Sequence, residues 1–335
     1  MKKKKRKIGI FSSRRNIRLR LQERIDIFLK KVEVIRLTLG EKFDRILTGL
    51  TYLSLLTLIL VFIYVFVSAR KNSRVEWIYF SHDVNIEQVI NSPFEIVIID
   101  YKKDGKEGGE LSKVDIARIK ASGKKVLSYI TLDTAQSYRF YWKDEWNTTL
   151  PDFIIDKKSN NSDYNVKYWE EAWKNILYKG KDNYVEKLLS LGFDGIDLIV
   201  SKEKNLQSGE IDTRQKMIDL ITEVAVEIKK INPHAQVYLH NKIDLAEEER
   251  VLNVIDGVVK ESLLFSDGVK RPENEIKKDI DILDKVVKAK KIVLVSESIS
   301  QKNEIKEFCT FTAIRRYIPH IEKGDDIENV KKGCS

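Results

Sequence analysis

The stretch YVEKLLSLGFDGIDLIV, residues 184–200, decides the fold. It closes an amphipathic helical segment that we expect at 168–190, which stops at Leu191-Gly192. A short apolar run follows at once and predicts a strand over Asp194–Ile199. A helix that leads directly into an apolar strand is the repeating unit of a parallel α/β sheet.

The same alternation continues outward along residues 72–335. Eight strands are expected, near Val75–Phe80, Glu95–Asp100, Lys125–Ile130, Asp194–Ile199, Gln236–His240, Gly257–Glu261, Ile292–Ser296 and Thr312–Tyr317. Helices are expected between them, near 84–91, 111–122, 168–190, 213–231, 245–254, 273–289 and 302–309. These 264 residues are close to the roughly 250 of one (β/α)8 TIM barrel, which is the fold class we predict. The alternative is a doubly wound open sheet, but no Gly-x-Gly-x-x-Gly follows the first strand.

Residues 46–69 contain no charged side chain over 24 residues. A helix of that length spans about 36 Å at roughly 1.5 Å per residue, enough to cross an apolar bilayer core of about 30 Å. The alternative is a cleaved signal peptide ending at Val67-Ser68-Ala69. The apolar run is longer than the roughly 7–15 residues of a signal core, and 45 residues precede it. The sequence therefore favours an uncleaved single-pass transmembrane helix.

Charge is distributed unevenly about this segment. Residues 1–45 hold 16 Lys and Arg against 5 Asp and Glu, a local net charge of +11. Since the whole chain has a net charge of +9, the other 290 residues carry −2. Only Arg70, Lys71 and Arg74 follow the span closely, which predicts a cytoplasmic N-terminus in the plasma membrane and an extracytoplasmic domain at 72–335. The basic arm suits anionic lipid, and the rest of the chain lacks the excess positive charge of a nucleic-acid binder.

The basic segment at 1–45 also contains a regular apolar stripe. The spacing of its apolar residues is close to 3.5 and predicts an amphipathic helix over 17–39. Its members are Ile17, Leu21, Ile25, Phe28, Val32, Ile35 and Leu39. Such a helix can lie on the inner leaflet, self-associate, or simply be solvated.

Cysteine and histidine usage limits the chemistry. The two cysteines, Cys309 and Cys334, are too few for a disulfide framework, and one bridge or two free thiols remain equally open. The four histidines, His82, His234, His240 and His320, are scattered without ligand spacing. We expect neither a metal nor a cofactor.

Acidic and amide side chains recur at or just beyond the ends of the predicted strands, except that Asp197 lies inside the fourth strand. They are Asp100, Asp133, Asp197, Asn241, Glu261 and Glu297. In a (β/α)8 barrel these ends converge on the functional rim, and a pair of carboxyl groups is what glycoside hydrolysis requires.

Aromatic residues cluster in two segments, the loop after the third predicted strand and the segment that leads into the helix expected at 168–190. They either stack on sugar rings or pack the loops against the barrel. They are Tyr138, Tyr141, Trp142, Trp146, Tyr164, Tyr168, Trp169 and Trp173, and for Trp173 packing is favoured.

The chain resembles glycoside hydrolase family 114, the endo-alpha-1,4-polygalactosaminidase-like barrels. The resemblance covers roughly residues 75–300 and rests on motifs in one order: IIDY (98–101), SYRFYW (137–142), VKYWEEAW (166–173), LGFDGIDL (191–198), Asn241 and DGVVKESLLF (256–265). It implies a barrel acting outside the cytoplasm on galactosamine-containing polysaccharide. Glu261 would then be one catalytic acid and Asp197 or Asp100 the other. Substrate-binding roles are expected for Asn241, Tyr138, Arg139, Trp142, Asp133, Tyr101 and Glu297.

Three positions depart from the family pattern. A further aspartate common two residues beyond Asp197 is Ile199, an acidic residue common after the third strand is Thr134, and Asn-Gly-x-Glu-Leu reads Asn-Lys-Ile-Asp-Leu at 241–245. Alternate strand residues share a face, so Asp197 lies about 6.5–7 Å below Ile199 and cannot replace it. The leading hypothesis is therefore a membrane-anchored glycoside hydrolase-like protein. The alternatives are a catalytically inactive barrel that binds glycan or a protein partner and, less favoured, a sensor.

Overall fold

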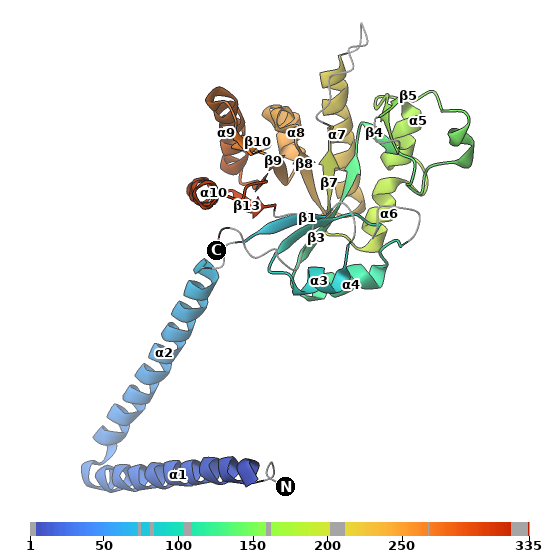
Figure 1. Ribbon diagram of the computed structural model, residues 1–335. Coiled ribbons are helices and arrows are strands. Elements are labelled where there is room, and N and C mark those ends of the chain that lie inside the picture. The colour runs from blue at the N-terminus through green and yellow to red at the C-terminus, as the bar shows by residue number, and fades with distance from the viewer. Residues whose placement is uncertain are drawn as a thin grey trace. The chain divides into compact units, whose positions relative to one another are not determined.

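The computed structural model describes residues 5–72, 75–80, 84–102, 109–158, 162–201, 212–266, 268–322 and 334. In the helical N-terminal segment, side chains are described for residues 20–38, 40, 42 and 44–63. The chain divides into two compact units, Met1–Ser73 and Arg74–Ser335. Both units are drawn in Figure 1.

The first unit consists of two helices, α1 (Lys5–Leu39) and α2 (Glu41–Asn72). Gly40 separates them with a φ of +61°, a conformation that glycine adopts without steric cost. The stretch Asp44–Ile63 of α2 is long and apolar enough to cross a membrane, and its side chains are not buried. On α1, Leu21, Ile25 and Phe28 of the predicted stripe are exposed, whereas the side chains of Ile17 and Leu39 lie outside the described residues.

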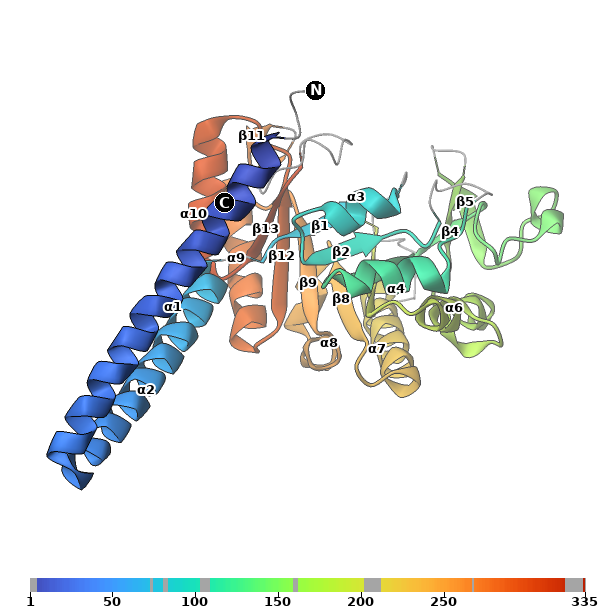
Figure 2. The ribbon, with the colours of Figure 1, turned by 90° about the horizontal axis from the view of Figure 1, so that it is seen from below.

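The second unit is built on eight parallel strands. Their order is β1 (Trp77–Phe80), β2 (Ile96–Ile99), β3 (Lys125–Thr131), β7 (Gly195–Ile199), β8 (Gln236–His240), β9 (Gly257–Glu261), β12 (Ile292–Glu297) and β13 (Ile318–Ile321). The outer strands β1 and β13 lie beside each other, and the Trp77 indole donates to the Val295 carbonyl at 3.2 Å. The strands thus form a nearly closed barrel, and the open-sheet alternative is wrong (Figure 2).

Helices surround the strands in Figure 1. They are α3 (Ile86–Asn91), α4 (Lys113–Ala121), α6 (Tyr184–Leu191), α7 (Thr213–Ile231), α8 (Glu249–Val254), α9 (Glu273–Lys288) and α10 (Lys302–Arg315), with 3-10 turns at Asp144–Asn147 and Ile243–Glu247. Asn85, Ser112, Asn183 and Asp212 cap four of the helices through their side chains.

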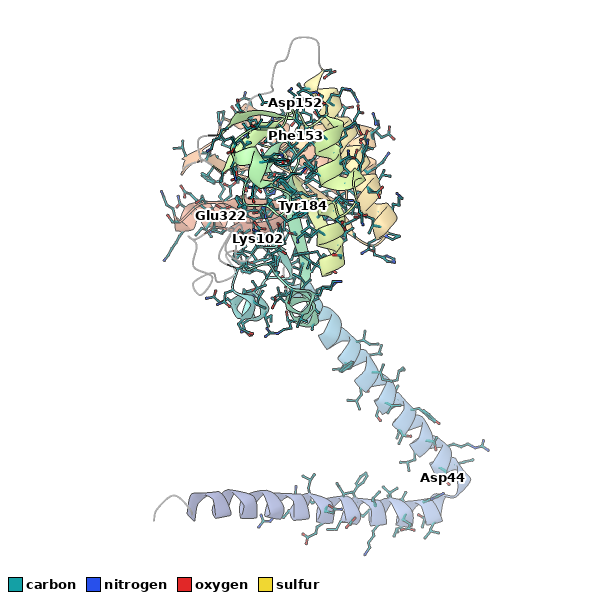
Figure 3. All side chains as sticks on the ribbon, turned by 90° about the vertical axis from the view of Figure 1, so that its right-hand side faces the viewer. Asp44, Lys102, Asp152, Phe153, Tyr184 and Glu322 are labelled. Atoms are coloured by element: carbon teal, nitrogen blue, oxygen red, sulfur yellow. A yellow bond between two sulfur atoms is a disulfide. The ribbon has the colours of Figure 1, made fainter. Side chains whose placement is uncertain are left out.

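Two apolar clusters hold the barrel. The larger lies between strands and helices, and the smaller fills the barrel interior. The fully buried members of the interior cluster include Ile98, Leu127, Tyr238, Val259 and Leu294. Figure 3 shows how densely side chains fill this unit, where the labelled Tyr184 is buried.

The predicted last strand was wrong. Residues Thr312–Arg315 belong to α10, Arg316 ends that helix with a φ of +64°, and β13 begins at Ile318. Phe308 and Thr312 are buried four residues apart, so this apolar segment follows a helical period rather than a strand period.

The predicted helix over 168–190 is interrupted. A helical turn, α5 (Glu171–Lys174), continues into a π-helical turn at Asn175–Lys179, and α6 starts afresh after Asn183. At Gly180 a Cβ atom would lie 2.6 Å from the Asn175 carbonyl oxygen, so the wide turn requires glycine there.

Small sheets that the sequence did not predict lie between barrel elements. The loop after β3 forms an antiparallel sheet ordered β4 (Thr134–Gln136), β6 (Asp163–Val166), β5 (Ile154–Lys157). A short pair, β10 (Phe265–Ser266) and β11 (Val269–Lys270), follows β9.

The two cysteines are bridged. Cys309 of α10 and Cys334 form a disulfide that packs against the larger core, so of the two alternatives left by the sequence the bridge is correct.

Candidate active site

The site lies at the carboxyl ends of β7, β8 and β9. Asp197 is in β7, His240 is the last residue of β8, and Glu261 is the last residue of β9. Adjacent parallel strands place their carboxyl ends on one rim, so residues distant in sequence meet there. Asp197 and Glu261 were expected from the sequence, whereas His240 was not, because an isolated histidine carries no ligand spacing. Its signal was its position as the last residue of a predicted strand.

His240 connects the two acids. Its Nδ1 lies 2.6 Å from a carboxylate oxygen of Asp197, and its Nε2 lies 3.2 Å from Oε1 of Glu261. The Asp197 and His240 side chains are buried, whereas the Glu261 side chain is 28% exposed. Glu261 is therefore the member of this trio that reaches solvent.

Charge governs the protonation of this trio. Burial disfavours the charged form of His240, but Asp197 and then Glu261 outweigh it and raise the pKa of His240 to about 9. Burial raises the pKa of Asp197, opposed by the His240 charge. A pKa of about 9 makes the imidazolium the form of the His240 ring at neutral pH, beside the carboxyl groups of Asp197 and Glu261.

Asn241 braces Glu261 from a second direction. It follows β8 with a φ of +66°, a left-handed conformation that asparagine tolerates, and its Nδ2 donates to Oε2 of Glu261 at 3.2 Å. Its Oδ1 is buried without a hydrogen-bond partner in the structure. Buried acceptors are ordinarily paired, so this oxygen is a candidate acceptor for a water molecule or for a ligand donor that reaches it.

Asp100 is committed to a different network. It follows β2, accepts from the Arg139 guanidinium at 2.6 Å and from the Tyr129 hydroxyl at 2.7 Å, and both ions are buried. The Arg139 guanidinium lies within 6 Å of the rings of Tyr101, Tyr129, Tyr138 and Tyr184. The negative charge of the buried Asp100 is thus balanced by the positive charge of Arg139.

Tyr79, which was not expected from the sequence, lies between the two networks. Its ring meets that of His240 edge-on at 5.6 Å and that of Tyr129 at 5.5 Å. Burial, followed by the charges of Asp197, Glu261 and Asp100, raises the pKa of Tyr79 well above its ordinary value. Tyr79 therefore remains a neutral hydroxyl beside three carboxyl groups.

Ile199 ends β7 next to this site. It pairs in register with Thr131 of β3 and His240 of β8, and its side chain packs against the barrel-interior cluster. The position where the family resemblance leads us to expect an acid therefore presents an apolar side chain beside His240.

Two further acids that the sequence predicted for the site accept hydrogen bonds from backbone amides. Asp133 accepts from the Ser201 amide at 3.0 Å, and burial raises its pKa. Glu297 accepts from the amides of Leu264 and Phe265, and its pKa is about 7 because burial outweighs those hydrogen bonds. Both carboxylates fix the loops that surround the rim.

The predicted aromatic residues divide between packing and partial exposure. Trp146, Tyr164, Tyr168 and Trp173 are buried, and Trp173 donates to the Leu132 carbonyl, so packing is the correct interpretation for these four. Trp142 is half-buried and stacks at 4.8 Å on Tyr164 of the small sheet. Tyr101 is buried and Tyr138 half-buried, both beside Arg139.

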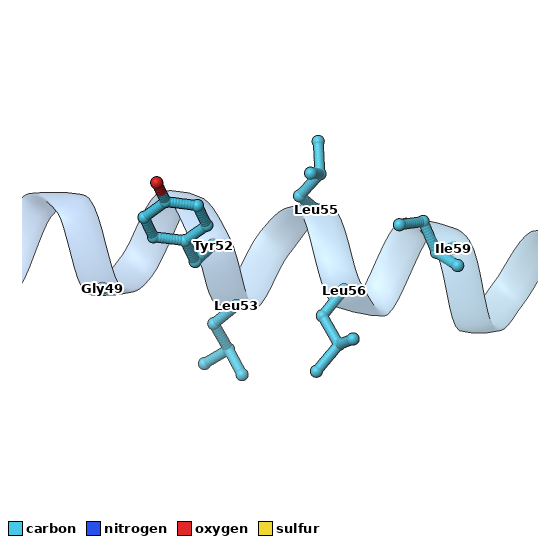
Figure 4. A pocket seen from close by; sticks show the side chains of 6 residues that line it. All are labelled: Gly49, Tyr52, Leu53, Leu55, Leu56 and Ile59. Atoms are coloured by element: carbon cyan, nitrogen blue, oxygen red, sulfur yellow. The ribbon is translucent and has the colours of Figure 1, made fainter.

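Two other features can be compared with this site within the part of the chain that the structure describes. An apolar depression of about 430 Å³ on α2 is lined by Gly49, Tyr52, Leu53, Leu55, Leu56 and Ile59, none of them charged (Figure 4). Within the described ranges, no group of three or more His, Cys, Asp or Glu is arranged to hold a metal ion. His82 lies outside those ranges.

The nearly closed eight-stranded parallel barrel is a (β/α)8 fold, and its carboxyl groups at the strand ends are of the kind that glycoside hydrolases use. The sequence model of glycoside hydrolase family 114 matches residues 68–334. The chain belongs to that family, as the sequence motifs suggested.

Relatives in sequence are widely spread. An uncharacterised protein of Methanocaldococcus jannaschii is 31% identical over 271 residues, which cover 76% of this chain and 77% of the relative. An uncharacterised protein of Thermotoga maritima is 28% identical over 266 residues, covering 77% and 78%.

Solved structures support the fold. The glycoside hydrolase domain of PelA from Pseudomonas aeruginosa superposes with a TM-score of 0.56 at 12% identity, covering 75% of this chain and 96% of that domain. Ega3 of Aspergillus fumigatus, solved with galactosamine, gives a TM-score of 0.54 at 14% identity, covering 74% and 91%.

Proposed function

We propose that this chain is a membrane-anchored protein whose barrel binds and hydrolyses an amino-sugar polysaccharide outside the cytoplasm, with Glu261 as a catalytic carboxyl group. The observation that carries this proposal is the position of Glu261 at the end of β9, partly exposed and held by His240 and Asn241. Family membership and the galactosamine complex of Ega3 support an amino sugar as the ligand.

Anchoring rests on α2 and the basic arm. Asp44–Ile63 has the length and apolar composition of a span, and the basic residues before it favour a cytoplasmic N-terminus. The Cys309–Cys334 disulfide supports an oxidising location for the barrel. The proposal includes binding of the basic arm to anionic lipid and self-association of the chain through helix 17–39.

Binding without cleavage is the second candidate, and one specific observation favours it. Hydrolysis by two carboxyl groups requires that both reach the scissile bond. Asp197 and Asp100 are buried and paired with His240 and Arg139, and Ile199 presents no acid. Glu261 then has no accessible partner among the acids that we predicted as catalytic.

Turnover and binding by the full-length chain in detergent micelles separate these candidates. We expect release of reducing ends from galactosaminogalactan-type polymer by the wild type and its loss in Glu261→Gln, while Glu273→Gln, an exposed glutamate of α9, behaves as wild type. Binding without turnover would establish the second candidate. Neither binding nor turnover on amino-sugar polymers would overturn both.

A further inference from the structure

We infer that His240 is a positioning residue for Glu261, anchored from below by Asp197, and that the three side chains hold a shared proton that Glu261 can present to a bound ligand. The inference deepens the proposed function and rests on it for the role of Glu261. It concerns a histidine that neither the sequence pattern nor the comparisons single out.

Hydrogen-bond stoichiometry carries the argument. Both ring nitrogens of His240 face carboxylate oxygens, Nδ1 toward Asp197 at 2.6 Å and Nε2 toward Glu261 at 3.2 Å. A neutral imidazole has one N–H, and an ionised carboxylate only accepts, so the two contacts together need two protons. One lies between Nδ1 and Asp197. The other belongs to the contact between Nε2 and Glu261.

The location of this second proton decides what Glu261 is. On Nε2 it leaves Glu261 as a carboxylate that supports positive charge. Moving it to Glu261 breaks the N–H bond, forms an O–H bond and leaves His240 neutral with Nδ1–H still donated to Asp197. The transfer needs no other reactant. Glu261 is then the protonated acid, and the His240 ring beside it is neutral.

The surroundings of His240 fit this role. Asp197 faces it from β7, Glu261 from β9, and the edge of Tyr79 from β1. Tyr79 stays neutral, so Asp197 and Glu261 are the charged groups that raise the pKa of the His240 ring. His320 provides the contrast within the same barrel. It is buried between Trp77 and Phe94, and burial lowers its pKa to about 4.

The first test reads the ring directly and needs no ligand. Histidine labelled with ¹⁵N in the full-length chain gives ring signals for only four residues, assigned by substitution. We expect His240 to remain an imidazolium until the pH approaches 9, and His320 to stay neutral down to about 4. In Asp197→Asn, the pKa of His240 should fall clearly from about 9, because the Asp197 charge that opposes the effect of burial is lost while only Glu261 remains.

The Glu261→Gln variant keeps Asp197 and should leave the pKa of His240 above 6.5. A wild-type His240 that titrates at or below 6.5, or an Asp197→Asn ring that titrates as in the wild type, would overturn the inference. Since this readout is independent of activity, it stands even if the proposed function fails.

The second test asks whether His240 acts through Glu261. The affinity for a galactosamine oligosaccharide is measured in His240→Gln, Glu261→Gln and the double variant. We expect each single change to weaken binding at least about tenfold, and the double variant to bind no more weakly than Glu261→Gln alone. Multiplicative losses would show that His240 acts separately and would refute the positioning role. No affinity in the wild type would instead refute the proposed function.

Discussion

Burial distinguishes the acids of this barrel more sharply than their position in the sequence does. Asp100, Asp197 and Glu261 all lie at or near strand ends, yet Asp100 is held by Arg139, Asp197 by His240, and only the Glu261 side chain is partly exposed. An ionised group stays buried when a counter-charge and hydrogen bonds compensate for its lost hydration. Proximity to the rim therefore identifies candidate catalytic acids, and pairing with a buried counter-charge decides which of these acids is available to a ligand.

The Asp100–Arg139 pair is expected to stabilise the fold. In Asp100→Ala the buried guanidinium loses its counter-charge, which should lower the free energy of unfolding by about 3–5 kcal/mol. The control, Glu87→Ala, removes an exposed partner of Arg118 and should cost about 1 kcal/mol or less. Urea unfolding of both variants measures this. An Asp100→Ala variant as stable as the wild type would contradict this structural role of the Asp100–Arg139 pair.

At the scale of elements, the sequence predicts regular strands and helices better than interruptions. The helix expected at 213–231 matches α7, because its apolar period is long and its ends are marked by Asp212 and Asn232-Pro233. The break near Gly180 was missed, since a single glycine does not reveal a π-helical turn. The small sheet after β3 was also missed, because its three short strands pair across a loop rich in polar residues.

The same distinction applies to the candidate site. Acids at strand ends were predictable, since a strand boundary and a charge are both visible in sequence. The Asp197–His240–Glu261 contacts were not, because they depend on the register between β7, β8 and β9. Arg139 was predicted to bind sugar, and its buried contact with Asp100 likewise depends on a tertiary arrangement.

The disulfide should stabilise the C-terminal part of the barrel unit. It links residues 25 apart in sequence, and closing a loop of that length in the unfolded chain is worth about 2–4 kcal/mol. Replacing Cys309 and Cys334 together by serine should lower the free energy of unfolding by that amount. Reductant should destabilise the wild type equally and leave the double variant unchanged. Free thiols in the natively expressed wild type would contradict the bridge.

At the scale of the whole molecule, the chain combines a basic arm, an apolar helix and a family 114 barrel. The charge asymmetry belongs to the arm, and the remaining 290 residues are close to neutral; under the proposed anchoring, this asymmetry would set a cytoplasmic N-terminus. Anchoring would hold the barrel near the cell surface, where an extended polysaccharide can reach it.

Protease protection tests the proposed orientation, in which the N-terminus is cytoplasmic and the barrel lies outside the cytoplasm. In intact cells, added protease should remove a C-terminal tag and spare an N-terminal tag until the membrane is permeabilised, because the basic arm is retained inside. Loss of the N-terminal tag from the mature protein would indicate signal cleavage. Protection of the C-terminal tag would place the barrel inside the cell.

The most direct measurement is the hydrolysis rate of amino-sugar polymer by Ile199→Asp, with and without Glu261→Gln. An aspartate at the end of β7 adds a carboxyl group to the rim beside His240, so turnover should rise at least about tenfold over the wild type, and the gain should vanish in the double variant. A rate that is unchanged by Ile199→Asp and survives Glu261→Gln would contradict the account.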